Sequence, residues 1–140
     1  MKSFFLEIIT PEKVAFSGEA EMVVVPSVEG NLGILADHAP LFAKLTEGEL
    51  KITTGEKETF FSLGEGFIEA TPQKTTILVT KALKADEIDE EKLLQAKKAA
   101  EEALKQKPTG EALISAQALL RSTLIDLKVK RRKRREWEGR

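Results

Sequence analysis

The sequence contains no cysteine and no tyrosine, and its single histidine is His38. The lack of cysteine excludes disulfides and cysteine-liganded zinc or iron–sulfur sites, and nothing indicates an oxidising compartment. No second strong ligand stands near His38 in sequence, so we expect no metal site. The G-x-S-x-G and Walker-type motifs are absent as well, and none of the 23 acidic residues is singled out as catalytic. We therefore expect a protein without catalytic residues of its own.

Long hydrophobic runs are also missing. No stretch approaches the roughly 20 apolar residues that a membrane-spanning helix needs. The opening residues 1–7 carry one lysine and a short apolar patch that an acid interrupts, which differs from a signal peptide. These features predict a soluble, cytosolic protein.

The net charge of −1 hides an asymmetry between the C-terminal end and the rest. Residues 128–140 hold eight basic and two acidic residues, a net charge of +6, so the remaining 127 residues sum to −7. The basic run has three interpretations: a solvated helix end, attraction to nucleic acid or an anionic membrane, or a cationic patch that docks on an acidic protein surface. Nucleic acid has no other support, because the rest is acidic and lacks an array of stacking aromatic residues.

The first part of the chain has the pattern of an all-β sandwich. Turn signals recur every eight to twelve residues up to about residue 82, which predicts about 8–10 strands. The β-branched run at 23–25 predicts a buried strand over 20–25. We expect a shaped, glycine-punctuated loop at 29–33 and a tight turn at 37–40, and loops of this kind often carry recognition.

Residues 83–140 predict an antiparallel α-helical hairpin. Asp86 is the expected N-cap of a first helix that runs to about Lys107. A breaker at 108–110 separates it from a second helix from about Glu111 to at least Val129, and so short a connection makes the helices antiparallel neighbours. The expected domains are therefore a β-sandwich at 1–82 and a helical hairpin at 83–140.

Apolar stripes at helical spacing predict how the two helices meet. The facing stripes are expected to be Ile88, Leu93, Ala96, Ala99, Ala100, Ala103 and Leu104 on the first helix, and Ala112, Leu113, Ala116, Leu119, Leu120, Leu124 and Leu127 on the second. Four of the first seven are alanines, each contributing about 0.8 kcal/mol of burial, so the hairpin is only modestly stabilised by its own contacts.

The second helix has another stripe on its opposite side, formed by Ile114, Ala118, Ile125 and Val129. A helix in an isolated hairpin needs one apolar face rather than two. The stripe either packs on the β domain or meets another chain. Both interpretations hold if the hairpin has two docking positions.

One stretch resembles a known family. Residues 26–41 read P-S-V-E-G-N-L-G-I-L-A-D-H-A-P-L, and further matching segments lie at 6–12, 16–20, 64–69 and 85–89. Together they resemble the epsilon subunit of the bacterial F-type ATP synthase, in order and over nearly the whole chain. The competing interpretation is a stand-alone β-sandwich binding module with a basic tail for nucleic acid or anionic membrane.

The resemblance implies a non-catalytic central-stalk subunit of a proton-translocating enzyme. In that family the sandwich joins the gamma subunit to the c-ring, and the C-terminal helices reach acidic segments of the catalytic alpha/beta subunits and restrain ATP hydrolysis. The implied location is the cytoplasmic face of the bacterial cell membrane, touched only through the complex, with no nucleic acid as partner.

The resemblance also implies partner-binding residues. A ring-contacting loop would include Glu29, Gly30 and Asn31, and His38 would lie on the rotor-facing side. The alternative for His38 is a turn residue that is solvated or hydrogen-bonded locally. The cationic patch would consist of Lys130, Arg131, Arg132, Arg134 and Arg135.

Some members of the family bind ATP through an I-D-x-x-R-A motif on the first helix and two arginines one turn apart on the second. Residues 88–93 read I-D-E-E-K-L instead, and lysine lacks the bidentate fork of arginine. On the second helix Arg121 is followed one turn later by Ile125 and Asp126, and the aspartate would repel phosphate. We expect no bound cofactor, with ATP as a regulatory ligand at Asp89, Lys92 and Arg121 as the alternative.

Overall fold

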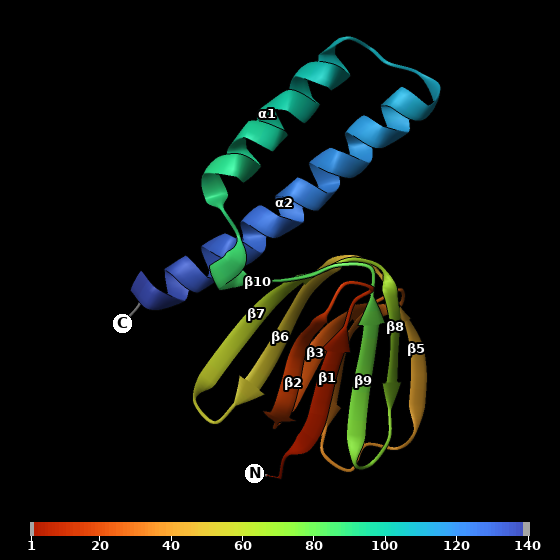
Figure 1. Cartoon of the computed structure of the whole chain (residues 1–140), viewed down its shortest axis with the longest axis vertical. Coiled ribbons are helices and arrows are strands. Elements are labelled where there is room, and N and C mark those ends of the chain that lie inside the picture. Colours follow the sequence, from red (N-terminus) through yellow and green to blue (C-terminus); the bar gives the residue numbers. More distant parts are fainter. Residues whose placement is uncertain (1, 139–140) are drawn as a thin grey trace. The chain divides into compact units, whose positions relative to one another are not determined.

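The computed structural model describes the backbone of residues 2–138 and the side chains of residues 2–132. The chain divides into two compact units, Met1–Ala85 and Asp86–Arg140. The first consists of strands, and the second contains two long helices (Figure 1). The fold class expected from the sequence, a β-sandwich followed by a helical hairpin, is confirmed.

The first unit is built from ten short strands. They are β1 (Phe4–Ile9), β2 (Val14–Ala20), β3 (Met22–Ser27), β4 (Gly30–Leu35), β5 (Leu41–Leu45), β6 (Gly48–Thr54), β7 (Lys57–Leu63), β8 (Gly66–Ala70), β9 (Lys74–Val79) and β10 (Ala82–Lys84). The order across the sheet is β10-β7-β6-β3-β5-β8-β9-β1-β2, and β4 pairs with β3 outside this path. Neighbouring strands run antiparallel except for the parallel pair β1 and β9.

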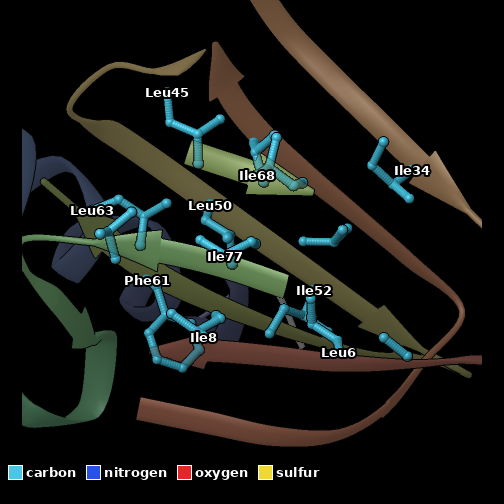
Figure 2. Close-up of a cluster of buried hydrophobic side chains, with 14 of the residues drawn as sticks. Leu6, Ile8, Ile34, Leu45, Leu50, Ile52, Phe61, Leu63, Ile68 and Ile77 are labelled. Carbon is cyan, nitrogen blue, oxygen red and sulfur yellow. The ribbon is translucent and has the colours of Figure 1, made fainter. Parts of the chain in front are cut away.

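One apolar core fills the interior of the sandwich that these strands form. The inward positions alternate with outward ones along most strands, so that Leu6 and Ile8 of β1 lie on the same side as Ile77 of β9. Figure 2 shows these side chains with Leu50, Phe61 and others converging from different strands. Fully burying each of these large side chains contributes about 1.5–3 kcal/mol, so the core specifies this unit strongly.

The prediction of a loop at 29–33 is wrong, because most of this segment belongs to strand β4. Ser27 pairs with Gly30, which closes a two-residue hairpin at Val28–Glu29, and β4 continues opposite β3 as far as Leu35. Leu32 and Ile34 point toward the core, while Asn31 and Gly33 are exposed. Leu32 and Ile34 alternate with exposed residues, as expected in a strand. The two glycines of the segment favoured the prediction of a loop instead.

The second unit holds a short 3₁₀ turn, η1 (Ala85–Glu87), and the helices α1 (Glu90–Lys105) and α2 (Gly110–Glu138). The helices lie side by side and antiparallel (Figure 1). Asp86, which the sequence predicted to be the N-cap, lies in η1 instead. Asp89 is the cap, since its carboxylate accepts a hydrogen bond from the backbone N–H of Lys92 at 3.3 Å.

The seam of the hairpin is narrower than the expected stripes. The apolar residues of α1 that are buried or half-buried are Leu93, Ala96, Ala100 and Leu104, and buried or half-buried positions on α2 include Leu113, Ala116, Leu120, Thr123 and Leu127. The spacing of three and four residues on α2 is that of a coiled-coil seam. Five residues of the expected stripes are instead exposed: Ala99, Ala103, Ala112, Leu119 and Leu124.

The second expected stripe is mixed in its exposure. Ile114 is 66% exposed, Ala118 and Ile125 are half-buried, and Val129 is buried. That the stripe packs on the sandwich stays a prediction. Within the described residues, neither helix is long and apolar enough to cross a bilayer.

Candidate functional site

The first expected contact site is the tip of the β3–β4 hairpin. The turn residues Val28 and Glu29 are exposed, Val28 by 58%, and so are Gly30 and Asn31 at the start of β4. The Ser27 hydroxyl accepts from the Glu29 N–H at 3.2 Å and donates to the Gly30 carbonyl. Gly30 has a φ of +117°, which favours glycine. The tip is therefore a fixed protrusion that ends in an exposed apolar side chain.

The second expected contact, His38, lies at the other end of β4. It is half-buried in the turn to β5, and its Nδ1 lies 2.6 Å from the Ala39 carbonyl oxygen. This contact agrees with the alternative in which His38 is a turn residue that is hydrogen-bonded locally. Part of the ring is still accessible to a partner. The neighbouring Asp37 accepts a hydrogen bond from the Lys2 ammonium at 2.7 Å, and this bond with the aspartate's charge raises the pKa of Lys2. Since β4 has six residues at roughly 3.3 Å each, roughly 20 Å separate the tip from this turn.

A third surface was not expected from the sequence. Phe67 of β8, Leu78 of β9, Ile9 of β1 and Val14 of β2 are successive cross-strand partners on the outer face of the sheet. Phe42 of β5 extends this row, because its ring stacks on Phe67 with centroids 5.4 Å apart. We call these five residues the apolar band.

The apolar band is exposed and has a charged border. Phe42 is 67% exposed, Leu78 51% and Phe67 44%. Outward positions beside it carry Lys44 and Glu69, and the pair of Glu7 and Lys74 at 3.1 Å. An apolar centre with a polar rim is the usual composition of a protein–protein interface.

The sequence contained a signal for part of this band. In L-F-A-K-L at 41–45, Phe42 stands two residues before Lys44, on the same face of the strand. In G-F-I-E-A at 66–70, Phe67 stands two residues before Glu69 in the same way. A phenylalanine that alternates on the same side as a charged residue points to solvent. The assembly of the row depends on pairing between residues far apart in sequence, which no local pattern encodes.

The expected cationic patch lies on the last turns of α2. Arg131 and Arg132 are exposed and Lys130 is half-buried. The Arg131 Nε donates to the Glu90 carboxylate at 3.3 Å, which joins the beginning of α1 to this part of α2. The side chains of the other two members, Arg134 and Arg135, lie outside the described residues.

The three nucleotide candidates are not brought together. Asp89 is engaged as the N-cap of α1, and the Lys92 side chain is exposed close by. Arg131 is bonded to Glu90, which lies beside the cap of α1. Arg121 precedes Arg131 by ten residues on α2, so it lies about 15 Å along the helix axis from the cap and from Lys92.

Arg121 instead borders an open groove of the hairpin with a volume of about 630 Å³. Its other lining residues are Leu104, Gln117, Leu120, Leu124, Ile125 and Lys128. Four of these are large apolar side chains, so the groove resembles a phosphate site poorly. Among the described residues, no cluster of three or more acidic or histidine side chains could hold a metal ion.

Comparison with known proteins identifies the family. The family described as "ATP synthase, Delta/Epsilon chain, beta-sandwich domain" matches residues 3–85. An ATP synthase epsilon chain of Herpetosiphon aurantiacus is 40% identical, with 92% of this chain and 95% of that protein aligned. The epsilon chain of Moorella thermoacetica is also 40% identical, over 91% and 96% of the two chains.

The chain belongs to the ATP synthase epsilon-chain family. The identification made from residues 26–41 and the other matching segments is thereby confirmed, and the interpretation as a stand-alone binding module falls away. The epsilon-chain fold also matches a chain of the Euglena gracilis mitochondrial ATP synthase, solved with the c-ring, at a TM-score of 0.67 and 22% identity over 92% and 78% of the two chains. At that identity the match supports the fold.

Proposed function

We propose that this epsilon-type chain joins the gamma subunit to the c-ring in the rotor of ATP synthase, and that its helical hairpin restrains ATP hydrolysis. Membership in the epsilon-chain family over more than nine-tenths of the chain carries the proposal. The chain contributes no catalytic residue of its own, in keeping with the lack of nucleophile and phosphate-loop motifs in the sequence. It works at the cytoplasmic face of the membrane, which it touches through the complex.

The apolar band is the proposed gamma-binding surface. Its five apolar side chains span neighbouring strands of a rigid sheet, and a charged border surrounds them. Burying such a centre under a partner stabilises a permanent contact better than isolated charges do. His38 lies at the β4–β5 turn, four residues before Phe42, so we propose that it contacts the rotor at the edge of the same surface.

The tip of the β3–β4 hairpin is the proposed c-ring contact. Glu29, Gly30 and Asn31 are exposed there, and Val28 adds an apolar side chain that the sequence reasoning did not single out. The rigid turn fixes how far these residues protrude.

Reciprocal substitutions test these two surfaces. Leu78→Ser in the band should weaken binding of purified gamma subunit and leave binding of detergent-solubilised c-ring unchanged. Val28→Ser at the tip should have the opposite effect. The two side chains have similar exposure, so each variant is the control for the other. Equal effects of both variants on both partners would contradict the assignment.

The cationic patch of α2 is the proposed contact with the alpha/beta subunits. Each exposed ion pair contributes about 0–1 kcal/mol, so several must act together and salt should weaken the contact. Deleting residues 108–140 should raise ATP hydrolysis by the assembled complex while coupling persists. Replacing Lys130, Arg131 and Arg132 by glutamine should give part of that increase, and unchanged hydrolysis in both variants would rule out an inhibitory hairpin.

The proposal requires no bound cofactor. The separation of Arg121 from Asp89 and Lys92 argues against a nucleotide held by all three. Titration of the isolated chain with ATP, followed by the amide NMR signals of α1 and α2, tests this point. Saturable shifts at these three residues would establish ATP as a regulatory ligand instead.

A further inference from the structure

Strand β4 has one free edge. It pairs with β3 from Gly30 to Leu35, and no strand of the described residues pairs with its other side. A free edge presents a row of unpaired N–H and C=O groups, which can template pairing with a strand of another chain.

The hydrogen bonds of β3 reveal which β4 residues present these groups. The Pro26 carbonyl accepts from the Thr46 N–H at 2.9 Å, on the side away from β4. Val24 and Met22 lie two and four residues before Pro26, in register with β6, so their backbone groups face the same side as those of Pro26. Backbone groups of an antiparallel strand alternate between its two neighbours.

The β4 residues opposite Met22, Val24 and Pro26 are Leu35, Gly33 and Asn31. Their N–H and C=O groups are therefore directed to the free edge. All three residues are exposed, and a Cβ added at Gly33 would meet no atom within 4 Å. Within the sandwich, the three outward-directed residues are open to solvent, so this edge is accessible to a second backbone.

The β4 edge also lacks the usual protection against pairing. Natural edge strands are kept apart by charged side chains, proline, bulges or short length. At one end of the sheet β10 has only three residues, and at the other β2 carries Glu19 and has an extra residue, Ala15, that bulges from its pairing with β1. The β4 sequence G-N-L-G-I-L has six residues and neither charge nor proline.

We propose that β4 binds a strand of the gamma subunit along this free edge, so that the sheet continues into the partner. This inference rests on the proposed function and adds a second, backbone-mediated contact to the apolar band. The partner strand is uncharged opposite Gly33 and Leu35, because Leu35 offers an exposed apolar surface there. Such a strand would run between the hairpin tip and the His38 turn, along the roughly 20 Å that separate the two expected contact sites.

A matched pair of variants at Gly33 tests the proposal. Gly33→Pro removes the outward N–H without touching a hydrogen bond to β3, and proline is tolerated at such edge positions. Gly33→Ala keeps the N–H and places its methyl group in open space. We expect Gly33→Pro to weaken binding of purified gamma subunit at least about tenfold, and Gly33→Ala to change it less than about twofold.

Amide hydrogen exchange of the unaltered chain gives a second measurement that does not depend on a variant folding. On addition of gamma subunit, exchange at Asn31, Gly33 and Leu35 should slow markedly, whereas Leu32 and Ile34 are already bonded to β3 and should change little.

The outcomes separate this inference from the proposed function. Failure of the unaltered chain to bind gamma would overturn both. Normal binding with equal affinity of both Gly33 variants, or with no slowing at the three outward amides, would overturn the β4 proposal alone. Slowing of the same amides in the chain by itself, increasing with its concentration, would instead show pairing between two copies and overturn the assignment to gamma.

Discussion

The two units of this chain bury very different side chains. In the sandwich, large residues such as Leu6, Phe61 and Ile77 are almost completely inaccessible. The buried residues of the second unit are fewer, and they combine Ile88, Leu127 and Val129 with two alanines, Ala100 and Ala116, and two polar residues, Thr123 and Asp126. Because hydrophobic stabilisation grows with the apolar area removed from water, one chain combines a strongly specified body with a weakly held pair of helices.

This difference suits the two roles proposed for the chain. A rotor coupling must transmit torque without deforming, which requires a continuous core and fixed outer surfaces. A regulatory element must change partners at a cost of a few kcal/mol, which the narrow seam of the hairpin allows. Stability should therefore be measured separately for the two units, because local unfolding of the hairpin need not involve the sandwich.

The largest effect is expected from the sandwich core. Phe61 is buried and its ring meets that of Phe16 edge to face at 6.2 Å. Phe61→Ala should lower the free energy of unfolding of the sandwich by about 3–5 kcal/mol, because the cavity cannot be filled by its neighbours. Urea denaturation followed by NMR signals of the strands measures this. Leu78→Ala on the exposed apolar band is the control and should cost about 0.5 kcal/mol or less.

The sequence predicted this core well and the exposed surfaces poorly. The β-branched run at 23–25 and the alternation of Leu6 and Ile8 with Glu7 identify buried strands, because period two and residue type agree there. In the apolar band Ile9 lies beside Leu78, because strands β1 and β9 are neighbours in the sheet. Local patterns do not encode such pairing, so the band became visible only in the fold.

The N-cap of α1 and strand β4 were predicted wrongly. Asp86 and Asp89 are both good N-caps followed by acidic residues, so local preference cannot choose between them. In β4, Gly30 and Gly33 are typical of a loop, but the pairing with β3 overrides that preference. Both errors concern segments whose local signals are compatible with two structures.

The second largest effect should come from the hairpin seam. Ala100 is 1% exposed where the helices pass each other. Ala100→Leu should destabilise the hairpin by about 1–3 kcal/mol, because three additional carbon atoms force the helices apart. Circular dichroism at 222 nm during heating would report early loss of helix while strand signals persist. Simultaneous melting of helices and strands would contradict the proposed independence of the units.

A smaller effect is expected at the helix cap. Asp89→Ala should cost the hairpin about 1 kcal/mol, since the Lys92 N–H loses its acceptor at the first turn of α1. Asp89→Asn should restore most of this stability, because asparagine is an equally good cap. The exchange rates of the first amides of α1 measure both variants. An equal loss in both would mean that the charge of Asp89 acts on the helix dipole rather than through the capping hydrogen bond.

The smallest effect should come from the ion pair of Glu90 and Arg131, which joins the two ends of the hairpin at 3.3 Å. The Arg131 side chain is 54% exposed, so water and salt screen the attraction and the coupling should be about 0–1 kcal/mol. A double-mutant cycle with Glu90→Gln and Arg131→Gln isolates this coupling from the other contacts that Glu90 makes. The coupling should fall when the salt concentration rises from about 0.05 to 0.5 M. A coupling that is large and insensitive to salt would mean that the hairpin is locked by its charges, and the contrast between a rigid sandwich and a weakly held pair of helices would then be wrong.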